Sequence, residues 1–176
     1  DADNVAGGEM ATRHLLGLGH RRIAMLTGRP DLESSREREE GFRRAMEAAG
    51  VTIDESLVRV GGYRPESAEA PARELLTRPD RPTAIFAAND LSAIRTIQVA
   101  QELGLRVPED LSVIGFDNVP ESAMAVPPLT TINQPMREIG AAALGILVGL
   151  LEDRPPASNH LQLPTSMVER ASCAPL

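Results

Sequence analysis

The stretch that decides the fold is Leu111–Asn118, with the sequence LSVIGFDN. Val113 and Ile114 are β-branched and the run is short, which is typical of a strand buried on both faces of a parallel sheet. The run leads into Asp117, so a carboxylate stands at the carboxyl end of the strand. Open α/β sheets bind their ligands at that edge. From this stretch alone, a turn-forming or capping role explains Asp117 equally well.

The composition indicates one globular domain without a basic surface. The chain has 176 residues, enough for a single sizeable core, and a net charge of −7. Its 18 basic residues are all arginine and form no basic cluster, so this chain itself offers no nucleic-acid surface. The lone Cys173 excludes an internal disulfide. The longest apolar run, 139–151, is shorter than the ~20 residues of a membrane span.

Helices and strands alternate up to the central stretch. We expect helices at 4–18, 34–49, 65–77 and 90–103, and strands at 21–27, 58–60, 83–87 and 111–118. This alternation predicts an α/β fold, a doubly wound and mostly parallel sheet flanked by helices. The strand tips at Gly28, Gly61, Ala88 and Asp117 should then share one edge of the sheet. Asn4 is the expected N-cap of the first helix, and Ser34 with Glu37 has capping-box spacing for the second.

The pattern changes after Pro127 and Pro128. A short strand is expected at 129–133, then a helix at 136–151, and two short strands at 161–163 and 167–169. The helix is apolar on nearly every side, whereas a surface helix of a single domain needs one apolar stripe. We therefore expect this helix to require burial on two sides.

Arg38 is the most informative side chain. The other arginines of its helix each have a glutamate at helical i±3 or i±4 spacing, but Arg38 has none. It lies one turn from Phe42, on the buried side, and near the start of the helix, where the dipole disfavours a cation. Such an arginine should meet a carboxylate or a ligand from elsewhere in the fold, and Asp117 is the candidate. The alternative is an arginine that extends into solvent.

Two further polar side chains follow predicted strands. Asn89 can both donate and accept hydrogen bonds, and it can also be the N-cap of the next helix. Tyr63, in a glycine-rich turn, could stack on a ring or simply pack in its loop. An arginine, an aspartate, an asparagine and an aromatic ring around a cleft bind a polyhydroxylated or ring-shaped ligand without reacting with it.

Catalytic and cofactor patterns do not emerge from the sequence. It contains no G-x-S-x-G nucleophile elbow and no G-x-G-x-x-G dinucleotide motif. His14, His20 and His160 stand apart, without neighbours at metal-ligand spacing. We therefore expect no enzyme activity, no metal and no cofactor.

Six segments carry a family pattern, in order along the chain: GHRRIAMLTG (19–28), REEGFRRAMEAAG (38–50), RPTAIFAANDLSA (81–93), GLRVPEDLSVIGFDN (104–118), PPLTTINQP (127–135) and LPTSMVERAS (163–172). In sequence and spacing they resemble the signatures of the LacI/GalR family of bacterial transcription regulators. The GHRRI, GFDN and PPLTTI segments distinguish these regulators from secreted sugar-binding proteins of the same fold.

The resemblance implies a protein with an N-terminal helix-turn-helix and a two-subdomain effector-binding region like a type I periplasmic binding protein. Residues 4–126 would be the second subdomain, 127–159 a strand and helix of the first, and 160–176 a return to the second. Operator DNA would be bound through a helix-turn-helix that is absent from this chain. A homodimer, a cytoplasmic location and no membrane partner are also implied.

The resemblance also implies a site for a small-molecule effector. The positions that match the family's effector contacts are Arg38, Asn89 and Asp117, with an aromatic at Tyr63 and loop contacts from Leu32 and Ser34. Purine-binding relatives have a second arginine where Leu32 stands, which argues against a purine-type effector. The prediction is the effector-binding and dimerisation region of a regulator, with a sugar or similar polar metabolite as effector. The alternative is a secreted sugar-binding protein of a transport system.

Overall fold

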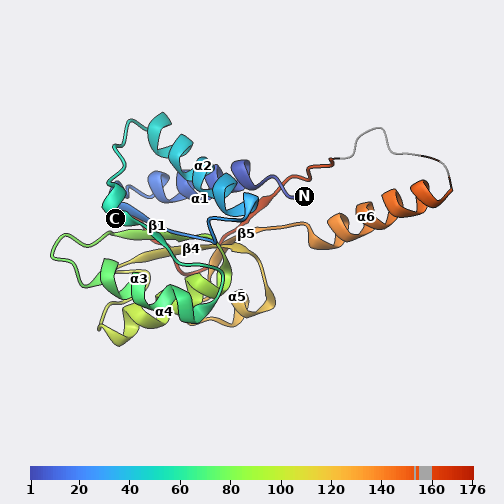
Figure 1. The fold of residues 1–176 in the computed structure, drawn as a ribbon. Coiled ribbons are helices and arrows are strands. Elements are labelled where there is room, and N and C mark those ends of the chain that lie inside the picture. The colour runs from blue at the N-terminus through green and yellow to red at the C-terminus, as the bar shows by residue number, and fades with distance from the viewer. Residues whose placement is uncertain (153, 155–159) are drawn as a thin grey trace.

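A six-stranded sheet forms the centre of the computed structural model, which describes residues 1–152, 154 and 160–176 (Figure 1). The strand order is β2-β1-β3-β4-β5-β6. All neighbouring strands are parallel except β5 and β6, which are antiparallel. The strands are β1 Ile23–Thr27, β2 Val58–Val60, β3 Ala84–Ala87, β4 Ser112–Asp117, β5 Thr130–Asn133 and β6 Ser166–Val168.

Helices cover both faces of this sheet, as the alternation predicts. In Figure 1, α1 and α2 lie on one face, and α3, α4 and α5 lie on the other. Their bounds are α1 Asn4–Gly17, α2 Glu33–Ala48, α3 Pro65–Leu76, α4 Asp90–Glu102 and α5 Pro120–Met124, with a 3-10 turn at Glu55–Leu57. The short helix α5 and the 3-10 turn were not expected from the sequence.

Each central strand packs into two cores because its side chains alternate between the faces. On β3, Ile85 joins the core beneath α3 and α4, and Phe86 joins the core beneath α1 and α2. On β4, Val113 and Ile114 divide in the same way. The double burial explains why these strands are continuous apolar runs. The parallel pairing of the strands places their tips at one edge of the sheet.

Two expected helix starts are wrong. The side chain of Asp3, rather than Asn4, caps α1 by accepting from the Ala6 N–H at 2.9 Å. Helix α2 begins at Glu33, with Leu32 at the cap position and no side-chain cap. Ser34 is therefore already inside the helix, and no capping box forms. The sequence pattern misled because Asp3 and Asn4 are adjacent and both are residue types that cap helices.

The helix α6, Met136–Leu151, leaves the body of the molecule together with Gln134 and Pro135; this segment is called the α6 arm (Figure 1). None of the helix residues, all of which are described, is buried. Strand β5 lies within the segment 127–159 that was expected to belong to the first subdomain, and it hydrogen-bonds to β4 as part of the main sheet. The predicted strand at 161–163 is a single bridge between Leu163 and Ala2.

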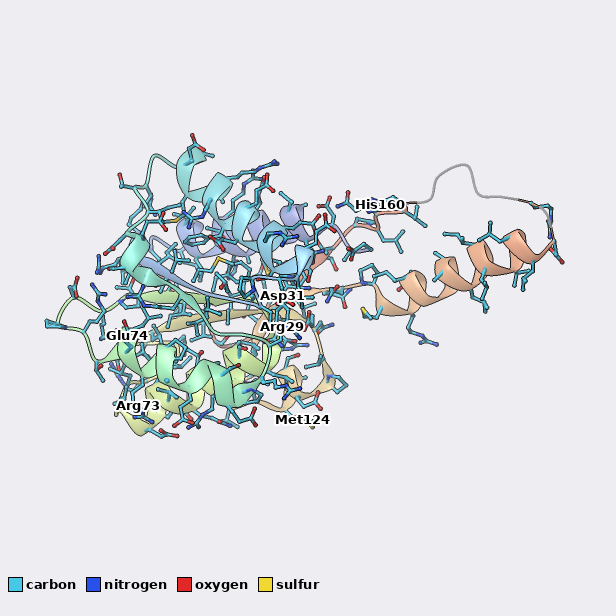
Figure 2. The ribbon with its side chains drawn as sticks, in the orientation of Figure 1. Arg29, Asp31, Arg73, Glu74, Met124 and His160 are labelled. Carbon is cyan, nitrogen blue, oxygen red and sulfur yellow. The ribbon has the colours of Figure 1, made fainter. Side chains whose placement is uncertain are left out.

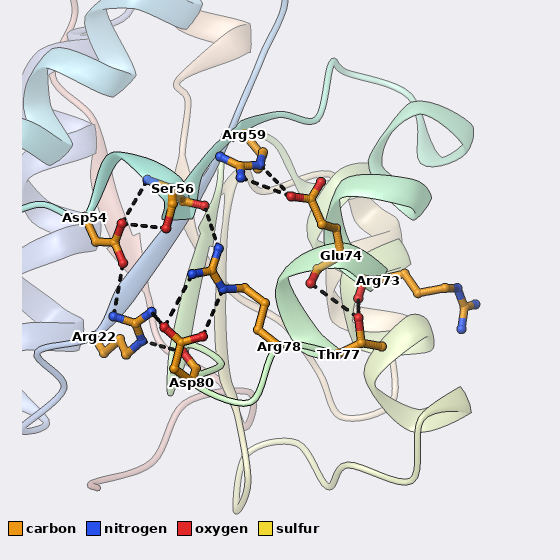
Figure 3. Close-up of polar contacts among 9 residues, drawn as sticks. All are labelled: Arg22, Asp54, Ser56, Arg59, Arg73, Glu74, Thr77, Arg78 and Asp80. Atoms are coloured by element: carbon orange, nitrogen blue, oxygen red, sulfur yellow. Dashed lines mark hydrogen bonds and ion pairs between the residues drawn. The ribbon is translucent and has the colours of Figure 1, made fainter.

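Ion pairs join the loops at the opposite, amino-terminal edge of the sheet (Figure 3). Arg22 contacts Asp80 at 2.6 Å and Asp54 at 3.2 Å. Arg78 contacts the same Asp80 at 3.2 Å and donates to the carbonyl oxygen of Ser56. The pairs are exposed, so their contribution to stability is small. Within the described residues, no helix has the length and apolar character needed to span a bilayer.

Candidate ligand-binding site

Arg38 lies buried at the carboxyl edge of the sheet, with 5% of its surface exposed. Its Nε donates to Asn4 Oδ1 at 2.9 Å, and its Nη1 donates to the Ala88 carbonyl oxygen at 2.5 Å. The same Nη1 lies 3.2 Å from Asp117 Oδ1. The expectation that Arg38 meets Asp117 is confirmed, and the alternative of a solvent-exposed arginine is wrong.

Asp117 stands at the end of β4 in a strained backbone conformation. Its φ is 119°, and that of the next residue, Asn118, is 60°. Positive φ is costly for residues with a Cβ, and such strain concentrates at functional sites. Gln134 Nε2 donates to Asp117 Oδ1 at 2.6 Å. Burial raises the pKa of the Asp117 carboxyl, while Arg38 and Gln134 act in the opposite direction.

Aromatic rings enclose the guanidinium of Arg38. Its Cζ lies 3.8 Å from the centre of the Phe116 ring and 5.7 Å from that of Tyr63. The Tyr63 ring fits against Gly28, where a Cβ would lie 2.3 Å from Tyr63 Cζ. The glycine at the tip of β1 therefore makes room for the aromatic side chain. Cation–π contacts with these two rings stabilise the guanidinium, which is largely shielded from water.

Asn89 takes the capping role that the sequence allowed. Its Oδ1 accepts from the Ser92 N–H at 3.0 Å, so it is the N-cap of α4. Its Nδ2 donates to the Tyr63 carbonyl oxygen at 3.2 Å. The cap and the Tyr63 turn are thus held together beside the Arg38 contact at Ala88. Ligand binding by Asn89 stays a prediction.

The loop before α2 and the first turn of that helix supply the remaining predicted residues. Ser34 Oγ lies 3.4 Å from Tyr63 Oη, and Leu32 is 36% exposed at the start of the helix. Figure 2 labels Arg29 and Asp31 on this loop, where they form an exposed ion pair at 2.6 Å. Ser34 therefore contacts Tyr63, whose ring lies beside Arg38, whereas Leu32 has its side chain at the surface.

A cleft of about 550 Å³ opens beside Asp117, between the turn 117–120 and the segment 133–138 at the root of the α6 arm. Of the predicted site residues, all of which are described, Asp117 alone lines it. The contacts of Asp117 with Arg38 and Gln134 both use Oδ1, and no contact within the described part of the chain uses Oδ2. A free carboxylate oxygen beside a cleft can accept hydrogen bonds from a hydroxyl or amide group of a ligand.

Sequence reasoning missed three residues of this site. Asn4 was expected to be a cap, Phe116 was assigned only to the strand core, and Gln134 was not considered. Gln134 follows β5 just as Asp117 ends β4, since Asp117 pairs with Asn133. The rule that parallel strand tips share an edge could have found Gln134, but nothing local marks Asn4.

Comparison with known proteins agrees with this architecture. A family model described as "Periplasmic binding protein-like domain" matches residues 12–173. The chain is 45% identical over 174 residues to the HTH-type transcriptional regulator DegA of Bacillus subtilis, covering 99% of this chain and 51% of that protein. The chain spans about half the length of the curated relatives it matches.

Two solved structures have the same fold. One is a complex of the transcriptional regulator CelR with cellobiose, at a TM-score of 0.94 and 39% identity, covering 98% of this chain and 53% of that chain. The other is a regulatory protein of the LacI family from Chloroflexus aggregans, at a TM-score of 0.92 and 36% identity, covering 99% and 63%. The chain belongs to the family of periplasmic binding protein-like domains, in the form found in LacI-family transcription regulators.

Proposed function

We propose that this chain is the effector-binding region of a bacterial DNA-binding transcription regulator. The observation that carries the proposal is the buried Arg38–Asp117 pair at the carboxyl edge of β4, on a strained turn beside a cleft. Ligands of open α/β sheets bind at this edge. A regulator such as DegA among the similar proteins supports this reading over a secreted sugar-binding protein.

The proposed effector is a sugar or a similarly polar metabolite. Arg38, Asp117 and Asn89 would bind its hydroxyl groups, Tyr63 would pack on its ring, and Ser34 and Leu32 would add further contacts. The similar CelR structure holds cellobiose, which supports this ligand class. The site has donors, acceptors and an apolar ring, and it lacks a nucleophile–base pair among its described residues. We therefore propose binding without catalysis.

The remaining assignments follow from the regulator proposal. Residues 4–133 and 160–176 would form the second subdomain, and the α6 arm would belong to the first. The full protein would bind operator DNA through a helix-turn-helix, act as a homodimer and reside in the cytoplasm.

A thermal-shift screen of the full-length protein tests the proposal. The panel is cellobiose, glucose, ribose and hypoxanthine. A ligand at a hundred times its Kd should raise the Tm by about 5 °C or more, because binding to the folded state alone stabilises it by mass action. An Asp117→Ala protein is the control and should not respond. A shift with hypoxanthine alone would contradict the sugar-like effector, and an equal shift in the control would contradict the site.

A further inference from the structure

Asp90 is a fully buried carboxylate next to the candidate site, and the proposed ligand contacts do not use it. It is the first residue of α4, directly after Asn89, and its side chain is 0% exposed. Its Oδ2 accepts from the Val119 N–H at 2.9 Å, and its Oδ1 accepts from the Thr131 hydroxyl at 2.5 Å. A buried carboxylate of this kind needs an explanation, because leaving water is costly for a charged group.

The path of this side chain crosses the central strand. Asp90 follows β3, and Thr131 lies on β5, so the carboxylate must pass behind β4 to reach it. It passes at Gly115, where a Cβ would lie 2.3 Å from Asp90 Oδ1. The glycine in the middle of an otherwise apolar strand therefore provides the space through which α4 reaches β5.

The contact with Val119 acts on the strained turn. Val119 directly follows Asp117 and Asn118, the two residues with positive φ. The Asn118 side chain is also held, by Asn133 at 3.0 Å and by Arg170 at 2.7 Å. The hydrogen bond to Asp90 holds the backbone itself, because it fixes the N–H of the residue that directly follows the two strained residues.

We propose that Asp90 is a positioning residue for the ligand site: it holds the turn 117–119 in its strained conformation and so keeps the Asp117 carboxylate opposite Arg38. This inference rests on the proposed function only in calling the site a ligand site. The Thr131 contact extends the same hold to β5, which leads into Gln134, the second partner of Asp117. One buried carboxylate thereby sets the geometry of α4, the turn and the root of the α6 arm.

Three variants separate this role from general stability. Asp90→Ala removes both hydrogen bonds. Asp90→Asn keeps an acceptor for Val119 and can donate to Thr131; burial raises the pKa of Asp90 to about 7, so a neutral side chain is a close substitute. Thr96→Val is the matched control, because Thr96 is equally buried in α4 and its hydroxyl donates to the Ser92 carbonyl oxygen of the same helix.

The first measurement is hydrogen exchange in the ligand-free protein, at the Val119 amide and the Arg38 Nε–H. In Asp90→Ala both should exchange at least about tenfold faster, which corresponds to about 1.4 kcal/mol. In Asp90→Asn the change should stay within about threefold, and in Thr96→Val neither position should change beyond the shift of the whole domain. Should Asp90→Ala not fold, Thr131→Val replaces it, with exchange at Val119 expected to rise about threefold. Unchanged exchange at Val119 in the folded disruptive variant would overturn the proposal.

The second measurement is binding of whichever panel compound shifts the wild-type protein. Asp90→Ala should weaken it at least about tenfold, Asp90→Asn should restore most of the affinity, and Thr96→Val should leave it unchanged. Equal binding by Asp90→Ala and wild type would overturn the positioning role. If no panel compound binds wild type, the proposed effector class fails, while the exchange result still decides the role of Asp90 in the turn.

Discussion

A Cβ on Gly41 would lie 2.2 Å from the carbonyl oxygen of Val5, so α1 and α2 touch backbone to backbone at this point. Gly8 makes the reciprocal contact with the carbonyl oxygen of Arg38. This close approach brings Asn4 within hydrogen-bonding distance of the Arg38 side chain. The site therefore depends on Gly8 and Gly41, although these two residues contribute no functional group of their own.

Gly41→Ala should destabilise the domain by about 3 kcal/mol, because the added methyl group meets backbone that cannot move aside. Urea unfolding measures the change. Gly17→Ala is the control, since a Cβ there meets nothing within 4 Å, and it should be neutral or stabilise by about 0.5 kcal/mol. Similar midpoints for the two variants would contradict the close contact.

Arg38→Met should cost about 3–5 kcal/mol, because removing one partner of a buried pair leaves the other uncompensated. Asn4 and Asp117 would both lose a hydrogen-bond donor. Arg44→Met, on the exposed side of the same helix, should cost less than about 1 kcal/mol. The comparison uses unfolding free energies at one pH. Equal costs would show that the buried contacts of Arg38 stabilise the fold no more than a surface ion pair does.

Asp117→Ala in the full-length protein should abolish the response to effector while the domain still folds. Its carboxylate lies at the cleft, and its loss leaves Arg38 bonded to Asn4 and Ala88. The stability cost should be about 1.5–3 kcal/mol, the value of a hydrogen bond to a charged group. Calorimetric titration with the responding compound measures binding, and Asp110→Ala, in an exposed ion pair with Arg106, serves as the control. Retained affinity would make Asp117 a structural residue.

His20 should make the domain less stable in mild acid. Burial lowers its pKa from 6.5, and its ring contacts Thr83 Oγ1 at 2.9 Å and Ser112 Oγ at 3.0 Å. The unfolded chain therefore takes up a proton near pH 6.5 that the folded protein resists, so stability falls as the pH drops below about 6.5. Asp90, whose pKa burial raises to about 7, acts in the opposite direction over the same range, so this loss is measured as the difference between wild type and His20→Gln in unfolding free energies at pH 7.5 and 5.5. In His20→Gln the loss should shrink, and an unchanged pH dependence would exclude His20 as its source.

Local patterns were enough to predict the sheet and the central pair of the site. The apolar runs of β3 and β4 follow from burial on two faces, and Arg38 stood out because its helix offers it no acid. Its partner could be named because Asp117 ends a central strand. These inferences need only spacing along the chain and the rule that parallel strand tips meet.

Contacts between distant segments could not be predicted in this way. Asn4 bonds to Arg38 across the α1–α2 packing, and Asp90 reaches Thr131 behind β4. Both depend on where a missing Cβ lets two elements approach, at Gly8 and Gly115. A sequence shows that a residue is glycine, but only the packed structure shows which neighbour occupies the space.

The route of the chain through the α6 arm has a consequence for cleavage. Strand β6 and the C-terminal residues follow the arm, yet they are part of the body: β6 pairs with β5, Ser172 donates to the Val113 carbonyl oxygen, and the Leu176 N–H donates to the Leu18 carbonyl oxygen. A protease that cuts α6 would therefore produce two polypeptides without dividing the body. Expressed separately, residues 1–140 and 160–176 should reassemble by complementation. The edge of β5 would pair with β6, and the contacts at Val113 and Leu18 would bind the C-terminal residues.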